Sequence, residues 1–273
     1  MSKPRLQMIL SPAKTMNFAS CDVADAAGAS EAVGLSRVNE LAALLKTKSK
    51  AELTKILNVN DKIATENYER FADWDAAEPR QAVVAYAGFA YDKLQARTLS
   101  ADQLQVGQRR LLILSGMWGP VRPLDRIKPY RLEMACKALP EPYKKLAAYW
   151  QDTSTETLLA GFADGGDRAL VNIASDEYAA AIDFDAVKAA GVQVVKIEFH
   201  QGGKKAPTVH LKHGRGLVAR YIMLHDVDSV DALKGFDLED YSFSASASKD
   251  DVLVFSRDAA PAKKPAAKKA RKA

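Results

Sequence analysis

The sequence has few cysteines and no long apolar run, and each shortage narrows what the protein can be. Its two cysteines, Cys21 and Cys136, are far apart and form no C-x-x-C spacing. We therefore expect neither a disulfide framework nor a cysteine-rich metal site. No stretch reaches the ~18 apolar residues of a membrane span, and the apolar run near the N-terminus is too short for a secretory signal. We expect a cytoplasmic protein with reduced thiols and no membrane partner.

Histidine is also scarce. The sequence has four: His200, His210, His213 and His225. The best ligand spacing among them is one His-x-x-His on an apparent strand, which is weak evidence for a metal. We therefore predict neither a bound metal nor a cofactor.

Positive charge is concentrated at the C-terminal end of the chain. The sequence has 39 Lys and Arg against 34 Asp and Glu, a formal net charge of +5. Residues 259–273 hold six basic side chains and no acidic one, and removing them from the total of +5 leaves residues 1–258 at −1. We expect a near-neutral domain at 1–258 and a disordered Lys/Ala/Pro tail at 259–273, which has nothing to bury. Such a domain binds nucleic acid only through a local basic face.

The pattern of apolar residues predicts a mixed α/β fold. Strands are predicted at residues 6–10, 111–114, 169–174, 192–200, 207–212, 241–246 and 252–256. Helices are predicted from Ser30 and from Pro79 to Tyr86, and at about 50–57, 61–73, 100–110, 141–160 and 216–225. These elements interleave without a regular βαβ rhythm, which favours one mixed α/β domain with surrounding helices over a doubly wound sheet.

The segment 56–71 is similar to a helix-hairpin-helix motif. Two short helices are joined by Asn58, Val59 and Asn60, where the motif has Gly-apolar-Gly. Asn is the best non-glycine residue for the left-handed backbone that this turn needs. The second helix would offer unpaired N–H groups and its positive dipole end to a DNA phosphate, with Lys62 in its first turn. The alternative is an ordinary pair of helices packed on the core.

A proline-rich basic loop follows the strand predicted at 111–114. Its cations are Arg122, Arg126, Lys128 and Arg131. The prolines restrict the backbone, so these side chains would form a fixed array suited to phosphates. Alternatively, Arg122 and Arg131 pair with the neighbouring acids Asp125 and Glu133.

Three further cations, Lys212, Arg215 and Arg220, surround Gly214-x-Gly216-x-x-Ala219. The glycine spacing matches a dinucleotide fingerprint, but it lies late in the chain and no clear parallel strand with an acidic end follows, so we reject a Rossmann site. We predict instead an anion site at the N-terminus of the helix at 216–225. It would suit a nucleic-acid phosphate or a small phosphorylated ligand equally well.

Ser11 and Lys14 have the Ser-x-x-Lys spacing of serine acyl-transfer enzymes. This run leaves a strand, contains Pro12 and lacks an accompanying Lys-Thr-Gly element, which argues against a covalent serine. Contact of Lys14 with a phosphate or a carboxylate is the better interpretation.

Two acids and a phenol, Asp176, Glu177 and Tyr178, follow the strand predicted at 169–174. They offer a general acid or base, or a pair of metal-holding carboxylates. The alternative is that Ser175 or Asp176 caps the next helix while the acids neutralise nearby basic loops.

Five blocks of the sequence, in this order, resemble the YaaA family of bacterial peroxide-stress-resistance proteins. The blocks are 11–15, 114–125, 129–134, 172–178 and 215–220. The resemblance implies a single-domain mixed α/β fold peculiar to that family, with a positively charged cleft and a helix-hairpin-helix element that binds double-stranded DNA. It also implies a cytoplasmic bacterial protein that limits oxidative damage, in whose absence peroxide-stressed cells accumulate unincorporated iron.

Two hypotheses follow, and they share their basic residues. The first is a non-enzymatic protein that docks the Asn58–Asn60 turn on double-stranded DNA. Its basic cleft would be lined by Lys14, Arg122, Arg126, Lys128, Arg131, Lys212, Arg215 and Arg220. The second is an enzyme acting on a phosphorylated or nucleic-acid substrate, with Asp176, Glu177 or Tyr178 as acid or base. Neither predicts the oligomeric state.

Overall fold

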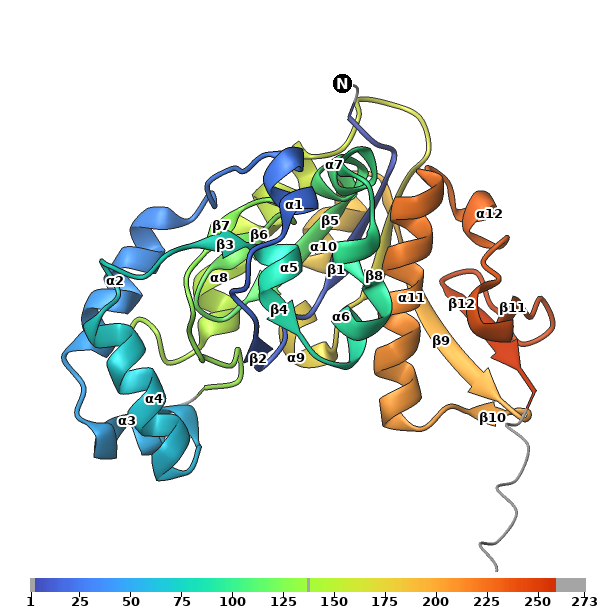
Figure 1. Cartoon of the computed structure of the whole chain (residues 1–273). Helices are drawn as coiled ribbons and strands as arrows, with labels where there is room; N and C mark the ends of the chain where they lie inside the picture. The colour runs from blue at the N-terminus through green and yellow to red at the C-terminus, as the bar shows by residue number, and fades with distance from the viewer. Residues whose placement is uncertain (1–2, 137, 259–273) are drawn as a thin grey trace, which may run out of the picture.

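The apolar runs of the chain assemble into one mixed sheet, seen in a computed structural model that describes residues 3–136 and 138–258 (Figure 1). The predicted tail at 259–273 lies outside the described residues. The sheet order is β11-β12-β9-β8-β1-β5-β6, with β10 paired to β9. The strands are β1 (Leu6–Leu10), β5 (Leu111–Ser115), β6 (Gly119–Val121), β8 (Arg168–Ile173), β9 (Val192–Gln201), β10 (Lys204–Lys205), β11 (Ser242–Phe243) and β12 (Val252–Arg257). The predicted mixed α/β class is confirmed.

Five of these strands are parallel, and their order places a crevice beside β1. The pairs β1–β5, β1–β8, β8–β9 and β9–β12 are all parallel, whereas β6, β10 and β11 are antiparallel to their neighbours. Numbered along the chain, the parallel strands are arranged 2-1-3-4-5. This is an order of doubly wound sheets, in which chain connections diverge between the first and third strands. The preference against a doubly wound sheet is therefore wrong, because long segments between the parallel strands, such as residues 11–110, hide the βαβ rhythm in the sequence.

Helices cover both faces of the sheet (Figure 1). On one face lie α6 (Phe89–Leu94), α7 (Ala101–Arg110) and α11 (Thr208–His225), which pack together. On the other lie α8 (Leu146–Ala160) and α10 (Phe184–Ala189). As a result every residue of β1 and β5 is buried, as expected for parallel strands covered on both sides.

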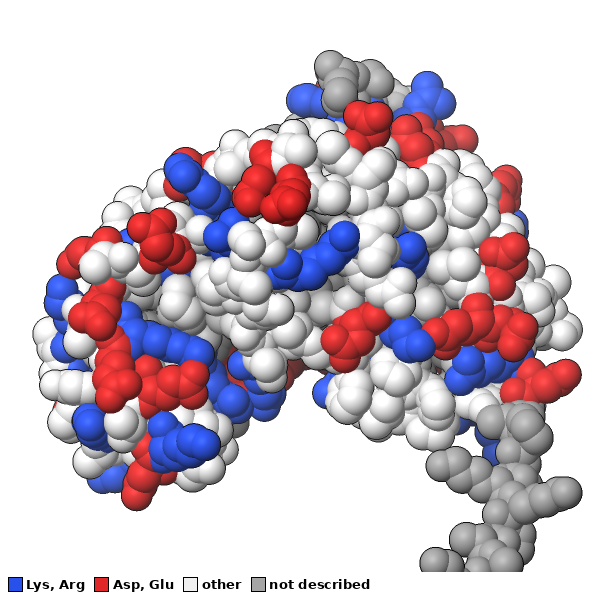
Figure 2. All heavy atoms as spheres, in the orientation of Figure 1, with Lys and Arg blue, Asp and Glu red and all other residues white. Residues whose placement is uncertain are grey.

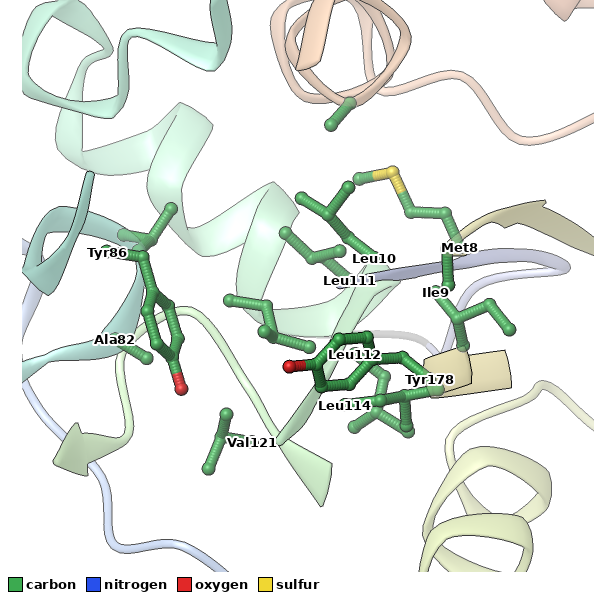
Figure 3. Close-up of a cluster of buried hydrophobic side chains, with 14 of the residues drawn as sticks. Met8, Ile9, Leu10, Ala82, Tyr86, Leu111, Leu112, Leu114, Val121 and Tyr178 are labelled. Atoms are coloured by element: carbon green, nitrogen blue, oxygen red, sulfur yellow. The ribbon is translucent and has the colours of Figure 1, made fainter. Parts of the chain in front are cut away.

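The centre of the core lies between β1 and β5. Figure 3 shows Met8, Ile9 and Leu10 of β1 beside Leu111, Leu112 and Leu114 of β5, and all six are at most 1% exposed. Tyr86 and Tyr178 reach the same cluster from other elements. The packed strands therefore provide a rigid base for the loops that leave their carboxyl ends.

The long segment of chain between β1 and β5 contains the remaining N-terminal elements. They are β2 (Thr15–Met16), α1 (Asp22–Ala27), α2 (Leu35–Lys46), α3 (Lys50–Leu57), α4 (Asp61–Ala72), β3 (Arg80–Gln81), α5 (Ala82–Ala85), β4 (Tyr86–Ala87) and a 3-10 turn at Ala96–Thr98. Strand β2 pairs with β4, and β3 pairs with β7 (Arg126–Ile127). The later short helices are α9 (Asp176–Ala179), α12 (Val230–Leu233) and a 3-10 turn at Leu238–Asp240. Among the described residues, no helix is both long enough and apolar enough to cross a membrane.

Several predicted boundaries are wrong. Residues 207–212 form the start of α11 rather than a strand, because Pro207 sits just before a helical run that continues to His225. The helix predicted from Pro79 is only α5, with short strands on either side. Ser30 caps no helix, since α2 begins after Gly34 and the Ser30 hydroxyl donates to Asp125 Oδ1 at 2.5 Å.

Capping boxes fix the start of two helices. Ser49 with Glu52 begins α3, and Ser100 with Gln103 begins α7. The helix predicted from residue 100 therefore begins where expected.

Candidate functional site

The turn between α3 and α4 has the backbone that the sequence predicts. Asn58 adopts the left-handed conformation, with φ 50° and ψ 57°. The N–H groups of Asn58 and Val59 both donate to the carbonyl of Thr54, which closes α3. The Asn60 side chain accepts from the N–H of Ile63 at 3.0 Å and so begins α4. Lys62 is exposed in the first turn of α4, where the earliest N–H groups have no partner within the helix.

The hairpin turn faces the body of the protein across a cleft of about 320 Å³. Its lining comes from the end of α3 and from the chain after the basic loop: Lys55, Ile56, Leu57, Asn58, Glu133, Ala135, Cys136 and Ala138. The Cys136 thiol donates to the carbonyl of Ile56 at 3.1 Å, and burial raises its pKa. Figure 2 shows the surface hollowed between the lobe of α2–α4 and the part that carries α6 and α11, with basic side chains on both sides.

The carboxyl ends of the parallel strands lie at this hollow, near β2 and α9 (Figure 1). Ser11 follows β1, and Ser175 follows β8 after one residue. The Ser11 hydroxyl oxygen accepts from the N–H of Ser175 at 2.9 Å, and the two hydroxyl oxygens are 3.2 Å apart. Tyr91 of α6 donates to the carbonyl of Ser11 at 3.0 Å. The two serines therefore join the strand ends at the position where the sheet order reverses.

Glu133 connects two of the predicted cations. Its Oε2 is 2.8 Å from Lys14 Nζ, and its Oε1 is 3.0 Å from Arg131 Nη2. The Lys14 side chain is 61% exposed and that of Arg131 is 19% exposed. The pairing of Arg131 with Glu133 is the alternative that the sequence offered. Lys14 and Arg131 therefore share one carboxylate.

The three predicted acid or base groups have different environments. Glu177 accepts from the N–H of Ala135 at 3.0 Å, which ties α9 to the cleft. Tyr178 is buried, and burial raises the pKa of its phenol well above the ordinary value. Asp176 is exposed and its charge acts on Arg215. Asp176 is therefore the most accessible of the three.

Arg215 lies in a different environment from Lys14 and Arg131. It is partly buried on α11, and burial lowers the pKa of its guanidinium while the charge of Asp176 raises it. Within residues 3–136 and 138–258, no hydrogen bond or ion pair reaches this guanidinium. The next residue, Gly216, lies against the backbone of Ala90 in α6, beside Tyr91. Arg215 therefore stands close to the joined strand ends.

The anion site predicted at a helix N-terminus is wrong in its geometry. Lys212, Arg215 and Arg220 lie inside α11, which begins at Thr208. Lys212 Nζ stands 6.0 Å from the ring centroid of Phe89, which is itself 47% exposed. These cations are spread along a helix face and do not frame the first turn.

Four other predicted cations are occupied elsewhere. Arg122 donates to the carbonyls of Gln108 and Thr157, Arg126 pairs with Glu31, Lys128 donates to the carbonyl of Trp74, and Arg220 donates to the carbonyl of Leu94. Burial lowers the pKa of Arg122, against the charge of Asp125. Its guanidinium lies beside Gly161 and Gln7, at the amino end of β1. Lys14 and Arg131 therefore lie beside Glu133, which lines the cleft under the hairpin, whereas Arg215 belongs to α11 on the other side of the hollow and Arg122 lies elsewhere.

Sequence reasoning overlooked a buried hydroxyl network beneath the strand ends. Ser115, the last residue of β5, is 2.6 Å from the Tyr130 hydroxyl, which is 2.8 Å from that of Tyr86. Burial raises the pKa of Tyr130 to about 12. Ser115 also accepts from the N–H groups of Met117 and Trp118. Ser115 ends an apolar run, as Ser11 does. This position was the sequence signal from which the hydroxyl network could have been predicted.

Among the described residues, no group of three or more His, Cys, Asp or Glu side chains could hold a metal ion.

Comparison with known proteins gives a matching family model and several relatives that align with most of the chain. The family model described as "Peroxide stress protein YaaA" matches residues 6–247. The chain is 38% identical to a UPF0246 protein of Bordetella pertussis over 253 residues, 91% of this chain and 98% of the relative. It is 38% identical to one of Ralstonia nicotianae over 257 residues, covering 93% and 99%. A third, from Burkholderia mallei, is 40% identical over 221 residues, covering 79% and 85%.

Proposed function

Because the chain belongs to the peroxide stress protein YaaA family, with a role in peroxide stress, we propose how it acts. It binds double-stranded DNA in the hollow between the α3–α4 hairpin and the strand ends, and it limits unincorporated iron during peroxide exposure. The iron effect is proposed from the family resemblance. The DNA-binding proposal has a physical basis in the molecule.

The observation that carries the DNA proposal is the geometry of the α3–α4 turn. Asn58 supplies the left-handed residue, and Asn60 starts a 12-residue helix whose first turn is exposed. Such a helix start presents N–H groups and the positive end of its dipole, which favour a phosphate. Lys62 adds a full charge in the same turn. The acid Asp61 sits beside it, so the expected attraction is modest and depends on backbone contacts.

The facing wall supports the same ligand. Lys14 and Arg131 share one carboxylate, that of Glu133, so a DNA phosphate can compete for either cation. Arg215 and Lys212 extend the basic groups along α11. Contacts of this kind follow the phosphate backbone, so binding should depend weakly on sequence and strongly on salt.

The test is duplex binding by the full chain over a range of salt concentrations. Each lost phosphate contact lowers the slope of log affinity against log salt by about 0.9. We expect Lys62→Glu to weaken binding and reduce the slope by about one contact or more. Lys188→Glu, an equal charge change on α10, is the matched control and should leave both unchanged. Equal effects of the two substitutions would refute docking by the hairpin.

The tail and the iron effect need separate tests. Deleting residues 259–273 should weaken binding at low salt without removing the difference between the Lys62 and Lys188 variants. If iron control depends on DNA binding, peroxide-treated cells carrying Lys62→Glu should show more unincorporated iron by electron paramagnetic resonance than cells carrying Lys188→Glu. Equal iron signals would separate the two activities.

An enzyme acting on a phosphorylated or nucleic-acid substrate is the second candidate, because acids and hydroxyls meet the strand ends. Glu177 is engaged by a backbone N–H and Tyr178 is buried, so Asp176 would be the acid or base. In that case Asp176→Ala should abolish turnover of a nucleic-acid substrate while duplex affinity is retained. Loss of affinity without any turnover in the unmodified protein would favour the binding protein.

A further inference from the structure

The end of the sheet beside β1 has the arrangement of a small-ligand site. In open parallel sheets, ligands bind outside the carboxyl ends of the strands, where neighbouring connections diverge. Here that position lies between β1 and β8, because β5 lies on one side of β1 and the later parallel strands lie on the other. Ser11 and Ser175 leave these two strands and meet there. Both serines are half-buried.

The Ser175 hydroxyl is not used as a helix cap. Ser175 occupies the N-cap position of α9, but its side chain makes no capping hydrogen bond. It contacts the Ser11 hydroxyl instead, at 3.2 Å. Each hydroxyl can both donate and accept, so the pair can turn its protons toward a bound anion. Two hydroxyls at one point supply short hydrogen bonds without adding charge.

Arg215 provides the charge. Its partly buried guanidinium has lost part of its hydration, and among the described residues the charge of Asp176 offsets this loss only in part, without a hydrogen bond. A partly buried cation without an acceptor is costly, and an entering anion would remove that cost. Arg215 is fixed in position by the close packing of Gly216 on Ala90. Lys14, 61% exposed, can reach the same ligand by leaving Glu133.

We propose that Ser11, Ser175, Lys14 and Arg215 bind the phosphoryl group of a nucleotide at this crevice. The neighbouring carboxylates determine which chemical groups the rest of the ligand can carry. The Asp176 charge acts on Arg215. Glu133 keeps its ion pair with Arg131 when Lys14 turns to the ligand, and the Glu177 carboxylate accepts from the N–H of Ala135. The accessible Asp176 carboxylate suits the hydroxyl groups of a sugar, which it can accept hydrogen bonds from. The site therefore combines one anion-binding end with one hydroxyl-binding end.

The same phosphoryl chemistry has two sources, a free mononucleotide or the phosphorylated end of a DNA strand. The hollow is open to both, because it also faces the α3–α4 hairpin. The phosphoryl site uses no hairpin residue, so it does not depend on DNA docking at Lys62. Failure of one proposal leaves the other testable.

The experiment is calorimetric titration of the full chain at low salt with inorganic phosphate, AMP and adenosine. We expect phosphate and AMP to bind and adenosine to bind at least about 10-fold more weakly than AMP, since a charged hydrogen-bonded pair is lost. Arg215→Gln and Lys14→Gln should each weaken AMP and phosphate about 10-fold or more. Lys188→Gln is the charge-matched control and should bind AMP as the unmodified protein does. Asp176→Asn should weaken AMP more than inorganic phosphate.

The DNA source has its own arm, a short duplex with or without a 5′-phosphate. A preference for the phosphorylated duplex that disappears in Arg215→Gln, together with weak AMP binding, would assign the site to DNA ends. Circular dichroism must show that Arg215→Gln is folded. If it is not, the exposed Lys14 variant decides. The proposal is overturned if neither AMP nor the 5′-phosphate is bound, or if Lys14→Gln and a folded Arg215→Gln bind like the control.

Discussion

Replacing Gly216 by alanine tests the closest helix contact of the fold. A methyl group at this position would overlap the backbone carbonyl of Ala90 in α6, well inside the ~3.3 Å at which carbon and oxygen normally meet. Backbone cannot rotate away as a side chain can, so α6 and α11 would have to move apart. Tyr91 follows Ala90 in α6, so this movement would also disturb the hydrogen bond from the Tyr91 hydroxyl to the Ser11 carbonyl.

The expected magnitude combines two opposing effects. Alanine is favoured over glycine inside a helix by about 1 kcal/mol. Overpacking a close contact costs about 1–3 kcal/mol and occasionally more, and overlap with backbone belongs at the upper end. The free energy of unfolding should therefore fall by about 2 kcal/mol. For a domain of this size that lowers the melting temperature by roughly 4–8 °C.

Gly107→Ala is the matched control for this prediction. Gly107 is also a helical glycine, in α7, but a methyl group there would meet the flexible end of the Met223 side chain. Methionine adjusts to irregular gaps at low cost, so the helix preference should offset the crowding to within about 1 kcal/mol. Urea unfolding followed by circular dichroism compares the two variants. Equal stability of the two would refute the argument that the Ala90 backbone excludes a side chain.

Three further predictions concern local features. Asn58→Ala should lower stability by about 1 kcal/mol, because the left-handed conformation is unfavourable for alanine, whereas Asn58→Gly should be neutral in the same urea assay. Ser100→Ala should cost about 1 kcal/mol by removing the capping box of α7, and loss of less than the assay error would contradict that role. Burial opposes the charge of Asp228, but hydrogen bonds from Arg110 and from the N–H groups of Arg5 and Leu6 outweigh it and lower the pKa of this carboxyl. Its contribution is therefore present above its unfolded-state pKa and is lost as pH falls through the folded-state value. Asp228→Asn should flatten the acid limb of the stability curve, and an unchanged limb would refute this assignment.

Local signals predicted the hairpin well. Asn58 and Asn60 determine their own backbone, because a side-chain oxygen can cap a helix and asparagine tolerates the left-handed region. Likewise, the short apolar run at Leu6–Leu10 is a fully buried strand, as its composition indicates. Features that depend on a few neighbouring residues could therefore be predicted from the sequence.

The position of Arg122 could not be predicted from the sequence, because it depends on the direction of β6. The chain turns at Gly119, where φ is 63°, and β6 then runs antiparallel to β5. Arg122 follows β6 and is carried back to the amino end of the sheet, away from Ser11. Arg131, later in the same loop, returns to the carboxyl end. Both residues are arginines of the same proline-rich loop. Neither the residue type nor the position in the loop contains information about this reversal.

The start of α11 was missed for a related reason. Thr208 and Val209 favour a strand when read locally, whereas Pro207 at the helix start and the packing of α11 against α6, α7 and β9 favour the helix. Gly216, which permits this packing, belongs to the dinucleotide-like spacing that we rejected as a Rossmann site. Its role is close contact between α11 and α6, whereas Gly214 packs against the Phe199 ring of β9.

The position of β1 has a consequence for synthesis of the protein in the cell. This strand leaves the ribosome first, yet Met8 pairs with Leu111 and Leu6 with Ala169. At typical translation rates of about 5–20 residues per second, its second partner arrives roughly 8–30 s later. Throughout that interval an apolar segment that belongs at the centre of the sheet lacks its β8 neighbour, and until β5 emerges it lacks both neighbours. Nascent chains should therefore recruit chaperones early, and release of the chaperone should coincide with emergence of β8.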